Sequence, residues 1–502
     1  MSQYDVIVVG AGNGGLVAAN TTAQAGYKTL LLEKHNLPGG CATSFVRGRF
    51  EFEAALHELC NHATSPYQDS AQKIFDRLGV KVELKYEDTL FRTICKGENG
   101  YDVRLPADYE KLLDVMEAEV PGCRESVKNY IDLIGDIDAA QDYIDAKGIN
   151  PAAIMIKYPD FLRAASTSNN EVMAACGIPP KAQSILNTYW GYLGVPADDL
   201  NGMHYISLFA AYLKTKPCMP LHKSHELSLA LAKTLQGFGG EIRYNSEVTR
   251  FLYDETGAAV GVIAGGETLY AKKIISNVIP NNVFNRSDPA RIPARDKKLA
   301  NARKLGMTFY TIYLGLDCSR EELGLDDYSV FIASDPDSRV QFEQRKDFGM
   351  YVVNCLNNVV PESSPAGTCT LFYTVMLMPG DFPESVKADG YKKFKSDIAE
   401  KYIRDSEETL GISIMPHIEE IVVATPVTFA RYLGTPEGAI YGYASQTWDN
   451  VVGRVAMKDM ENRIPNLHFC GGHASRGDGY PSGYITGAMA AADVLRELKE
   501  GK

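Results

Sequence analysis

The stretch that decides the fold is YDVIVVGAGNGG, residues 4–15. Its first half is an almost continuous apolar run, which is typical of a parallel strand that is buried on both faces. Its second half contains the spacing G-x-G-x-x-G, and the small residues LVAAN at 16–20 favour a helix directly after it. A strand, a glycine turn and a helix in this order predict a dinucleotide-binding unit.

The residues of this turn have separate roles in such a unit. Gly10 permits the tight turn, Gly12 lets the backbone approach a pyrophosphate, and Gly15 lets the helix pack closely on the strand. The helix N-terminus, at Asn13 and Gly14, offers free N–H groups and a partial positive charge to the phosphates. We therefore expect all five residues to contact the cofactor.

A second apolar strand, TLLL at 29–32, ends in an acidic residue. That residue, Glu33, is placed to bond the ribose hydroxyl groups of a dinucleotide. Its neighbour Lys34 is a further candidate for cofactor contact. The alternative is a glycine turn in an unrelated α/β protein, with Glu33 on the surface.

The last part of the chain repeats the pattern of a strand that runs into glycines. The sequence LHFCGGH at 467–473 is followed by GDGYPSG at 477–483 and by a helix rich in small residues. Such residues let a backbone and a helix N-terminus approach a ligand closely. The alternative is a tightly packed terminal helix without a ligand. The cofactor contacts expected here are Gly472, Asp478, Gly479, Tyr480 and Pro481.

Length, charge and cysteine usage limit the remaining possibilities. A chain of 502 residues is expected to form two or three domains, or one large α/β core with an insertion. The net charge of −12 argues against a nucleic-acid partner, because phosphates repel an acidic surface. We expect no spanning helix and no secretory signal, and hence a cytoplasmic protein. The ten cysteines are scattered without a CxxC pair, which predicts reduced thiols and no metal site.

The hydrophobic pattern divides the chain into a nucleotide-binding part and an inserted part. Residues 107–213 have mostly helical periodicity, and strand-rich stretches between 308 and 424 suggest a second sheet. The expected nucleotide-binding domain is discontinuous and comprises 1–105, 220–290 and 455–502. The expected substrate-binding or lid domain comprises 106–219 and 291–454.

These segments together resemble the phytoene desaturase, carotenoid isomerase and retinol saturase family of FAD enzymes, and the retinol saturase branch in particular. The resemblance spans nearly the whole chain and rests on residues 10–33, 39–57, 239–277 and 470–483. It implies an α/β fold that consists of a discontinuous Rossmann-like FAD-binding domain and an inserted α+β substrate domain. The fold is expected to be that of amine-oxidase-like flavoproteins, which have two dinucleotide-binding segments. It also implies FAD contacts at Gly39, Gly40, Cys41, Val248 and Asn277.

The sequence departs from the family pattern at three places. Cys41 stands where the family usually has a basic residue after the glycine pair. The stretch PLHKSH at 220–225 replaces a Pro-x-Gly-Gly motif, and ASRGDGYP at 474–481 replaces a Pro-Gly-Gly-Gly motif. The last two are expected near the flavin or the substrate. They favour a substrate that is smaller or more polar than a carotenoid, such as one with a carboxylate or carbonyl group.

Members of this family add hydrogen to carbon–carbon double bonds, remove it, or isomerise these bonds. For saturation, reduced flavin gives hydride from N5 to one carbon, and a positioned acid protonates the other. The candidate acids are Tyr480 and His57, and a packing role is the alternative for each. His222, Lys223 and His225 form a basic cluster that would hold a substrate carboxylate, or else lie on a solvated loop.

The predicted function is therefore FAD-dependent saturation or desaturation of a C=C bond in an unsaturated small molecule. Three alternatives remain open: a redox-neutral isomerase, a flavin amine oxidase and a non-enzymatic carrier of an apolar ligand. The presence of only two tryptophans weakens the amine oxidase, which often has an aromatic cage. No second G-x-G-x-x-G follows a strand, so the electron partner stays open between NAD(P)H, ferredoxin and quinone. Peripheral membrane contact would suit an apolar substrate.

Overall fold

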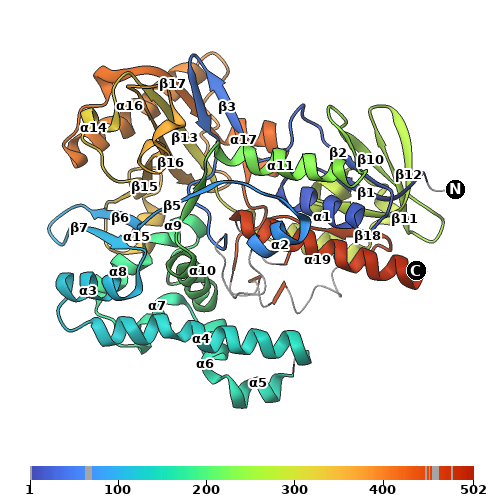
Figure 1. The fold of residues 1–502 in the computed structure, drawn as a ribbon, viewed down its shortest axis with the longest axis horizontal. Coiled ribbons are helices and arrows are strands. Elements are labelled where there is room, and N and C mark those ends of the chain that lie inside the picture. Colours follow the sequence, from blue (N-terminus) through green and yellow to red (C-terminus); the bar gives the residue numbers. More distant parts are fainter. Residues whose placement is uncertain are drawn as a thin grey trace.

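The first sheet of the computed structural model is built around the opening strand (Figure 1). The structure describes residues 3–62, 71–148, 150–446, 449–450, 453–454, 463–475, 477 and 479–501. In this sheet β1 pairs in parallel with β2 and β12, so that Ile7 lies between Leu30 and Ile274. The strand order is β10-β11-β12-β1-β2-β9, and β18 also pairs with β12. The strands are β1 (Tyr4–Val9), β2 (Thr29–Leu32), β9 (Glu241–Arg243), β10 (Val248–Tyr253), β11 (Ala259–Ala264), β12 (Glu267–Ser276) and β18 (Leu467–Phe469).

Alternate residues of β1 enter two different hydrophobic cores. Val6 and Val8 pack on the side of the helices, and Ile7 and Val9 pack with Phe251 on the other side. This arrangement confirms the prediction of a strand buried on both faces. The helices on the first side are α1 (Asn13–Gln24), α2 (Ala71–Leu78), α11 (Lys223–Gly237) and α19 (Gly479–Glu500).

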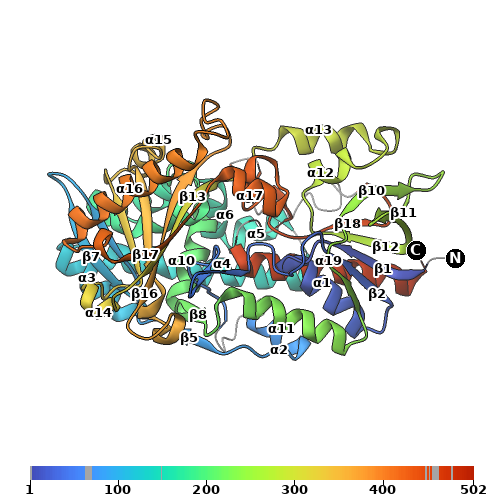
Figure 2. The same cartoon turned by 90° about the horizontal axis from the view of Figure 1, so that it is seen from above.

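The first and the last of these helices lie side by side (Figures 1 and 2). A Cβ atom at Gly487 would lie only 2.2 Å from the carbonyl oxygen of Gly14, so this approach requires glycine. Gly15 is equally constrained, because its Cβ would lie 1.9 Å from the carbonyl oxygen of Gly10. The two ends of the chain therefore form one packed unit.

The second sheet is mixed and has the order β17-β13-β16-β15-β14-β6-β7. Its neighbours are antiparallel except β6 and β14, and its central strands are fully buried. The sheet predicted from the strand-rich stretches is confirmed. Its strands are β6 (Thr89–Cys95), β7 (Tyr101–Pro106), β13 (Thr308–Leu316), β14 (Ser329–Ala333), β15 (Met350–Cys355), β16 (Cys369–Leu377) and β17 (Ile418–Ala424).

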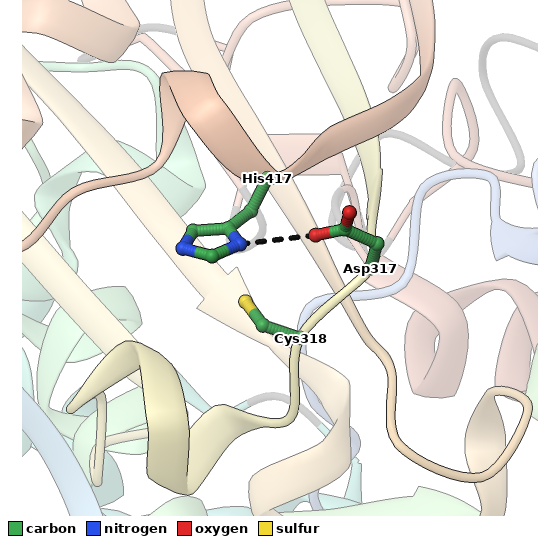
Figure 3. A group of neighbouring side chains, drawn as sticks. All are labelled: Asp317, Cys318 and His417. Atoms are coloured by element: carbon green, nitrogen blue, oxygen red, sulfur yellow. Dashed lines mark hydrogen bonds and ion pairs between the residues drawn. The ribbon is translucent and has the colours of Figure 1, made fainter.

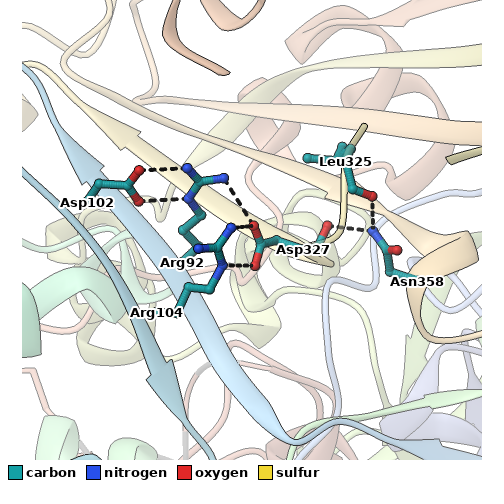
Figure 4. Close-up of polar contacts among 6 residues, drawn as sticks. All are labelled: Arg92, Asp102, Arg104, Leu325, Asp327 and Asn358. Atoms are coloured by element: carbon teal, nitrogen blue, oxygen red, sulfur yellow. Dashed lines mark hydrogen bonds and ion pairs between the residues drawn. The ribbon is translucent and has the colours of Figure 1, made fainter. Parts of the chain in front are cut away.

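The hairpin of β6 and β7 belongs to this second sheet, whereas the predicted boundary at 105/106 placed it in the nucleotide-binding domain. An ion-pair network explains the difference (Figure 4). Arg92 of β6 and Arg104 of β7 both donate to the carboxylate of Asp327, which lies just before β14. Asp327 is buried, and Asp102 pairs with Arg92 at 2.6 Å.

The stretch predicted to be helical is confirmed as a group of helices that packs against the second sheet through one extended core. Its helices are α3 (Tyr109–Glu119), α4 (Arg124–Lys147), α5 (Pro151–Lys157), α6 (Pro159–Ser166), α7 (Asn169–Ala175), α8 (Pro180–Leu186), α9 (Trp190–Leu193) and α10 (Gly202–Thr215). Two small sheets connect the parts, β3 (Ser44–Arg47) with β4 (Phe50–Glu53), and β5 (Leu84–Tyr86) with β8 (Cys218–Pro220). Further helices are α12 (Pro280–Asn285), α13 (Ala294–Ala302), α14 (Arg320–Leu323), α15 (Ser338–Glu343), α16 (Tyr391–Leu410) and α17 (Pro426–Leu433). Within the described ranges, none of the helices has both the length and the apolar character that a membrane crossing requires.

Candidate functional site

A large cavity lies between the two sheets, at the carboxyl ends of β1, β2 and β12. With the part that is open to solvent, it encloses about 1520 Å³. Ligands of open α/β sheets bind at this end of the strands. Both ends of the chain, α17 and the second sheet contribute to its wall.

The glycine turn forms one end of the cavity. Gly10 has φ +93°, and the backbone N–H of Gly39 donates to the carbonyl of Ala11 at 2.7 Å, which brings the two glycine segments together. A Cβ atom at Gly14 would lie 2.9 Å from the backbone nitrogen of Gly471, so the turn has no room for a side chain there. Gly10, Gly12 and Gly14 all line the cavity.

The helix N-terminus of α1 also faces this space. The side-chain oxygen Oδ1 of Asn13 is buried and has no hydrogen-bond partner among the described residues, and Asn13 lines the cavity. A buried polar atom without a partner costs free energy unless a ligand or water satisfies it. The free backbone N–H groups at the start of α1 suit a phosphate, and the amide oxygen of Asn13 suits a hydroxyl donor, so the cradle fits a phosphate-bearing dinucleotide.

Glu33 lies where a ribose would be expected. One of its carboxylate oxygens accepts from the backbone N–H of Ala11 at 2.7 Å, and the other accepts from the backbone N–H of His35 at 2.9 Å. Glu33 is buried and lines the cavity. Each oxygen keeps a lone pair for a ribose hydroxyl group.

Helix α17 closes this end of the cavity and lies between the two sheets (Figures 1 and 2). The ammonium of Lys34 donates to the carbonyl of Arg431 at 3.2 Å, and Nε2 of His35 lies 2.5 Å from the carbonyl of Tyr432. Burial lowers the pKa of Lys34. Lys34 also lines the cavity, and a segment of the inserted domain thus covers the expected ribose site.

The second glycine pair and the loop after it continue the wall. Gly39 and Gly40 have φ of +122° and +62°, a backbone that L side chains rarely adopt. Burial raises the pKa of the Cys41 thiol to about 12, so Cys41 is a neutral residue in the wall and not a thiolate. Val248 and Asn277 line the cavity as well, and the side-chain amide of Asn277 fills the space between the two glycine motifs.

The closing motif places some of its predicted residues at the cavity and not others. Gly472, Gly479 and Tyr480 line it. Pro481 lies in the first turn of α19 and is absent from the residues that line the cavity. Asp478 lies outside the described residues. The hydroxyl of Tyr480 donates to the carbonyl of Cys41, and burial, with Glu53 nearby, raises the pKa of Tyr480 well above its usual range.

The other end of the cavity is formed by the second sheet. Thr311 of β13 and Thr374 of β16 are cross-strand partners, and both line the cavity. Nε2 of His57 lies 2.8 Å from Oγ1 of Thr374, and the ring packs between Tyr192 and Phe372. This enclosure lowers the pKa of His57 to about 4, so the ring is neutral at neutral pH.

The basic cluster predicted near the start of α11 lies away from the cavity. His222 is exposed, and its backbone N–H donates to Glu226. Lys223 is buried, and its ammonium donates to the carbonyl of Ser363 at 3.0 Å. None of His222, Lys223 and His225 is among the residues that line the cavity, although Ser224, which lies between Lys223 and His225, interacts with Tyr480.

Sequence reasoning missed the apolar and polar residues that the inserted domain contributes. The cavity residues without a sequence motif include Phe309, Thr311, Thr374, Phe429, Ile440, Tyr441 and His473. The sequence signal for the two threonines is weak, because each of their strands contains a second threonine, Thr308 or Thr370, that does not line the cavity. The others come from segments whose position depends on the tertiary fold.

The chain is similar in sequence to known proteins. Residues 8–78 match the family model described as an NAD(P)-binding Rossmann-like domain. The chain is 23% identical to all-trans-retinol 13,14-reductase of Danio rerio, over 98% of this chain and 86% of that protein. It is also 23% identical to a chloroplastic prolycopene isomerase of Daucus carota, over 99% of this chain and 80% of that protein.

Solved structures agree in fold. An oxidoreductase from Methanosarcina mazei superposes with a TM-score of 0.65 at 16% identity, over 97% of this chain and all of that one. A putrescine oxidase variant gives 0.64 at 18% identity, over 99% of both chains. The predicted family resemblance is confirmed. Relatives named for retinol reduction and for carotenoid chemistry match nearly the whole of this chain. The amine-oxidase-like fold class is confirmed, and the predicted enzyme class agrees with the oxidoreductase names among the relatives.

Proposed function

We propose that the chain is an FAD-dependent oxidoreductase that adds or removes hydrogen across a C=C bond of an unsaturated substrate, either apolar or carboxylate-bearing. One observation carries this proposal. A single cavity extends from the glycine cradle of the nucleotide-binding sheet to the apolar and aromatic wall of the second sheet. A dinucleotide held by the cradle would therefore share its cavity with a substrate held by the inserted domain.

The residues of the cradle would hold FAD in a defined order along the cavity. Glu33 would bind the ribose hydroxyl groups, and the backbone at Gly12 and Gly14 would receive the pyrophosphate at the N-terminus of α1. The loop at Gly39 and Gly40 and the closing motif would continue toward the ring system. When bound, FAD supplies hydride transfer at N5.

The protein's own task is then to exclude water, orient the substrate and handle one proton. The raised pKa of Tyr480 keeps its hydroxyl group protonated well above neutral pH. His57 is neutral because its pKa is lowered to about 4, and its Nε2 shares a hydrogen bond with Oγ1 of Thr374, which lines the cavity. Both side chains line the cavity, so both stay candidates for the proton donor.

The substrate class follows from the wall and from the relatives. Phe309, Phe429, Ile440 and Tyr441 offer aliphatic and aromatic surface to a polyene. The retinol reductase and prolycopene isomerase relatives are named for conjugated polyenes. The departures from the family pattern favour a member of this class that is smaller or more polar than a carotenoid.

An anaerobic absorbance titration tests this function. The protein is reconstituted with FAD, reduced with NADH, NADPH or dithionite, and then mixed with polyenes and enoates. We expect a flavin spectrum that an unsaturated compound reoxidises with stoichiometric formation of its dihydro product. The absence of any flavin spectrum would contradict FAD binding. Reoxidation of the reduced flavin by oxygen alone, or reduction of the oxidised flavin by amines, would contradict the substrate class.

A redox-neutral isomerase is the second candidate, since prolycopene isomerases are relatives at the same identity as the retinol reductase. In the same titration it would convert substrate while the flavin stays reduced. The same test identifies the reductant that supports turnover, which is NAD(P)H, reduced ferredoxin or a quinol.

Peripheral membrane contact belongs to the proposal as well, since α5 exposes Met155 and Ile156. Sedimentation with phosphatidylcholine vesicles would test it.

A further inference from the structure

Three side chains of metal-binding type meet at one end of the second sheet (Figure 3). Asp317 and Cys318 directly follow β13, and His417 directly precedes β17. Nδ1 of His417 lies 3.0 Å from Oδ1 of Asp317. One ligand atom from each of the three residues lies within 4.8 Å of the other two. The fold thus brings together a carboxylate, a thiol and an imidazole that no local motif links.

The backbone holds these residues in place. The N–H of Asp317 donates to the carbonyl of His417 at 2.9 Å, and the next pair along the strands is Leu316 with Ile418. β13 is also paired along its whole length with β16. The three side chains are therefore carried by the ends of two neighbouring strands and not by a long loop.

We propose that Asp317, Cys318 and His417 form a binding site for Zn²⁺. Zinc takes sulfur, nitrogen and carboxylate oxygen ligands in a tetrahedral arrangement, with donor atoms roughly 3.3–3.6 Å apart. The three donors lie within 4.8 Å of one another, so the side chains would have to approach by up to roughly 1.5 Å to reach this geometry. Three protein ligands leave a fourth position for water.

Exposure and charge around the triad suit a cation that arrives from solvent. The side chains of Asp317 and His417 are 56% and 41% exposed, whereas Cys318 is buried beneath them. The carboxylate of Glu322 interacts with both His417 and Asp317. The nearby cation Arg49 is engaged by Glu419 at 2.6 Å, so it is partly neutralised.

The site is separate from the cofactor cavity. Thr311 lines the cavity, and Asp317 lies six residues further along the same chain, roughly 20 Å away at the rise of an extended strand. Zinc at this position would not touch a substrate. It would tie the end of β13 to the start of β17, and it would thereby stabilise the sheet whose other end forms the substrate wall.

Metal titration of the full-length, FAD-reconstituted protein tests this site. The protein is treated with a chelator, and Co²⁺ is added as a spectroscopic probe, followed by Zn²⁺ in competition and in calorimetry. We expect one Co²⁺ per chain, a thiolate-to-cobalt absorption band in the difference spectrum, and displacement by one Zn²⁺. The absence of that band in the wild-type protein would overturn the assignment of Cys318 as a ligand.

Three variants and one control locate the metal. Cys318→Ser should abolish the cobalt band, and each of Cys318→Ser, Asp317→Asn and His417→Gln should weaken Zn²⁺ binding at least about tenfold. The control is Cys176→Ser, which removes a partly exposed thiol from the helical part and should leave binding unchanged. Asp317→Asn alters only an exposed side chain, so it keeps the test decisive if Cys318→Ser folds poorly. Equal affinity in the wild type and Asp317→Asn would overturn the proposal.

Discussion

The hydroxyl group of Tyr480 donates a 2.8 Å hydrogen bond to the backbone carbonyl of Cys41, a residue 439 positions earlier in the chain. This bond joins the first turn of α19 to the loop that follows the second glycine pair. Both residues line the cofactor cavity. Tyr480 can therefore shape the cradle, supply a proton, or do both. The first role would affect FAD affinity, and the second would affect the rate of substrate reduction.

We predict that Tyr480→Phe lowers the rate of substrate reduction by about 100-fold, as expected for loss of a general acid. Its FAD affinity should fall by no more than about tenfold, the cost of one neutral hydrogen bond. Single-turnover kinetics and a flavin fluorescence titration measure the two effects. The control is Tyr484→Phe, one turn further along α19, whose hydroxyl has no partner among the described residues. Equal rates for both variants would assign Tyr480 a packing role alone.

A second prediction concerns Glu33. Glu33→Gln should weaken FAD binding by about 10- to 100-fold, because hydrogen bonds to a charged group are each worth about 1.5–3 kcal/mol. The apoprotein is titrated with FAD and followed by the quenching of flavin fluorescence. Glu241→Gln is the matched control, since Glu241 lies at the sheet edge and pairs with Arg243. A similar loss in both variants would show that general charge, and not the ribose contact, decides affinity.

The lowered pKa of His57 makes stability depend on pH. In the unfolded chain histidine titrates near 6.5, whereas in the folded protein the pKa of His57 is about 4. As the pH falls from about 6.5 to about 4, the unfolded state takes up the proton first, so the free energy of unfolding decreases. His57 accounts for no more than about 3 kcal/mol of this loss. Urea unfolding across this pH range should show a shallower decrease for His57→Gln than for the wild type, whereas His222→Gln, at an exposed position, should follow the wild-type curve.

The network around Asp327 gives a prediction for stability. Asp327→Asn should lower the free energy of unfolding by about 2–4 kcal/mol, because it leaves the largely buried Arg92 without its inner partner. Asp102→Asn removes the outer partner of the same arginine, and Asp102 is 46% exposed. It should cost less than about 1 kcal/mol. Comparable losses in chemical denaturation would contradict the assigned importance of the inner pair.

The sequence predicted the parts of the fold whose signals are local. The opening strand, the glycine turn and the strand at 308–316 were all readable from a few neighbouring residues, because period and glycine spacing reflect backbone geometry directly. The hairpin of β6 and β7 was predicted to belong to the nucleotide-binding domain, because its partner Asp327 is more than 200 positions away in the chain. Lys223 shows the same limit for a site: its burial against Ser363 depends on a contact that the motif around it does not contain.

The close contact of α1 with α19 has a consequence for biosynthesis. The glycine turn emerges from the ribosome long before the wall that Gly472, Gly479 and Tyr480 provide, because these residues lie far downstream of it in the chain. The nascent chain therefore carries an incomplete cradle until these downstream residues have been synthesised. If the cavity holds FAD as proposed, loading would follow the synthesis of α19, and any truncation or fusion that hinders this helix should yield a colourless protein even where every earlier motif is intact.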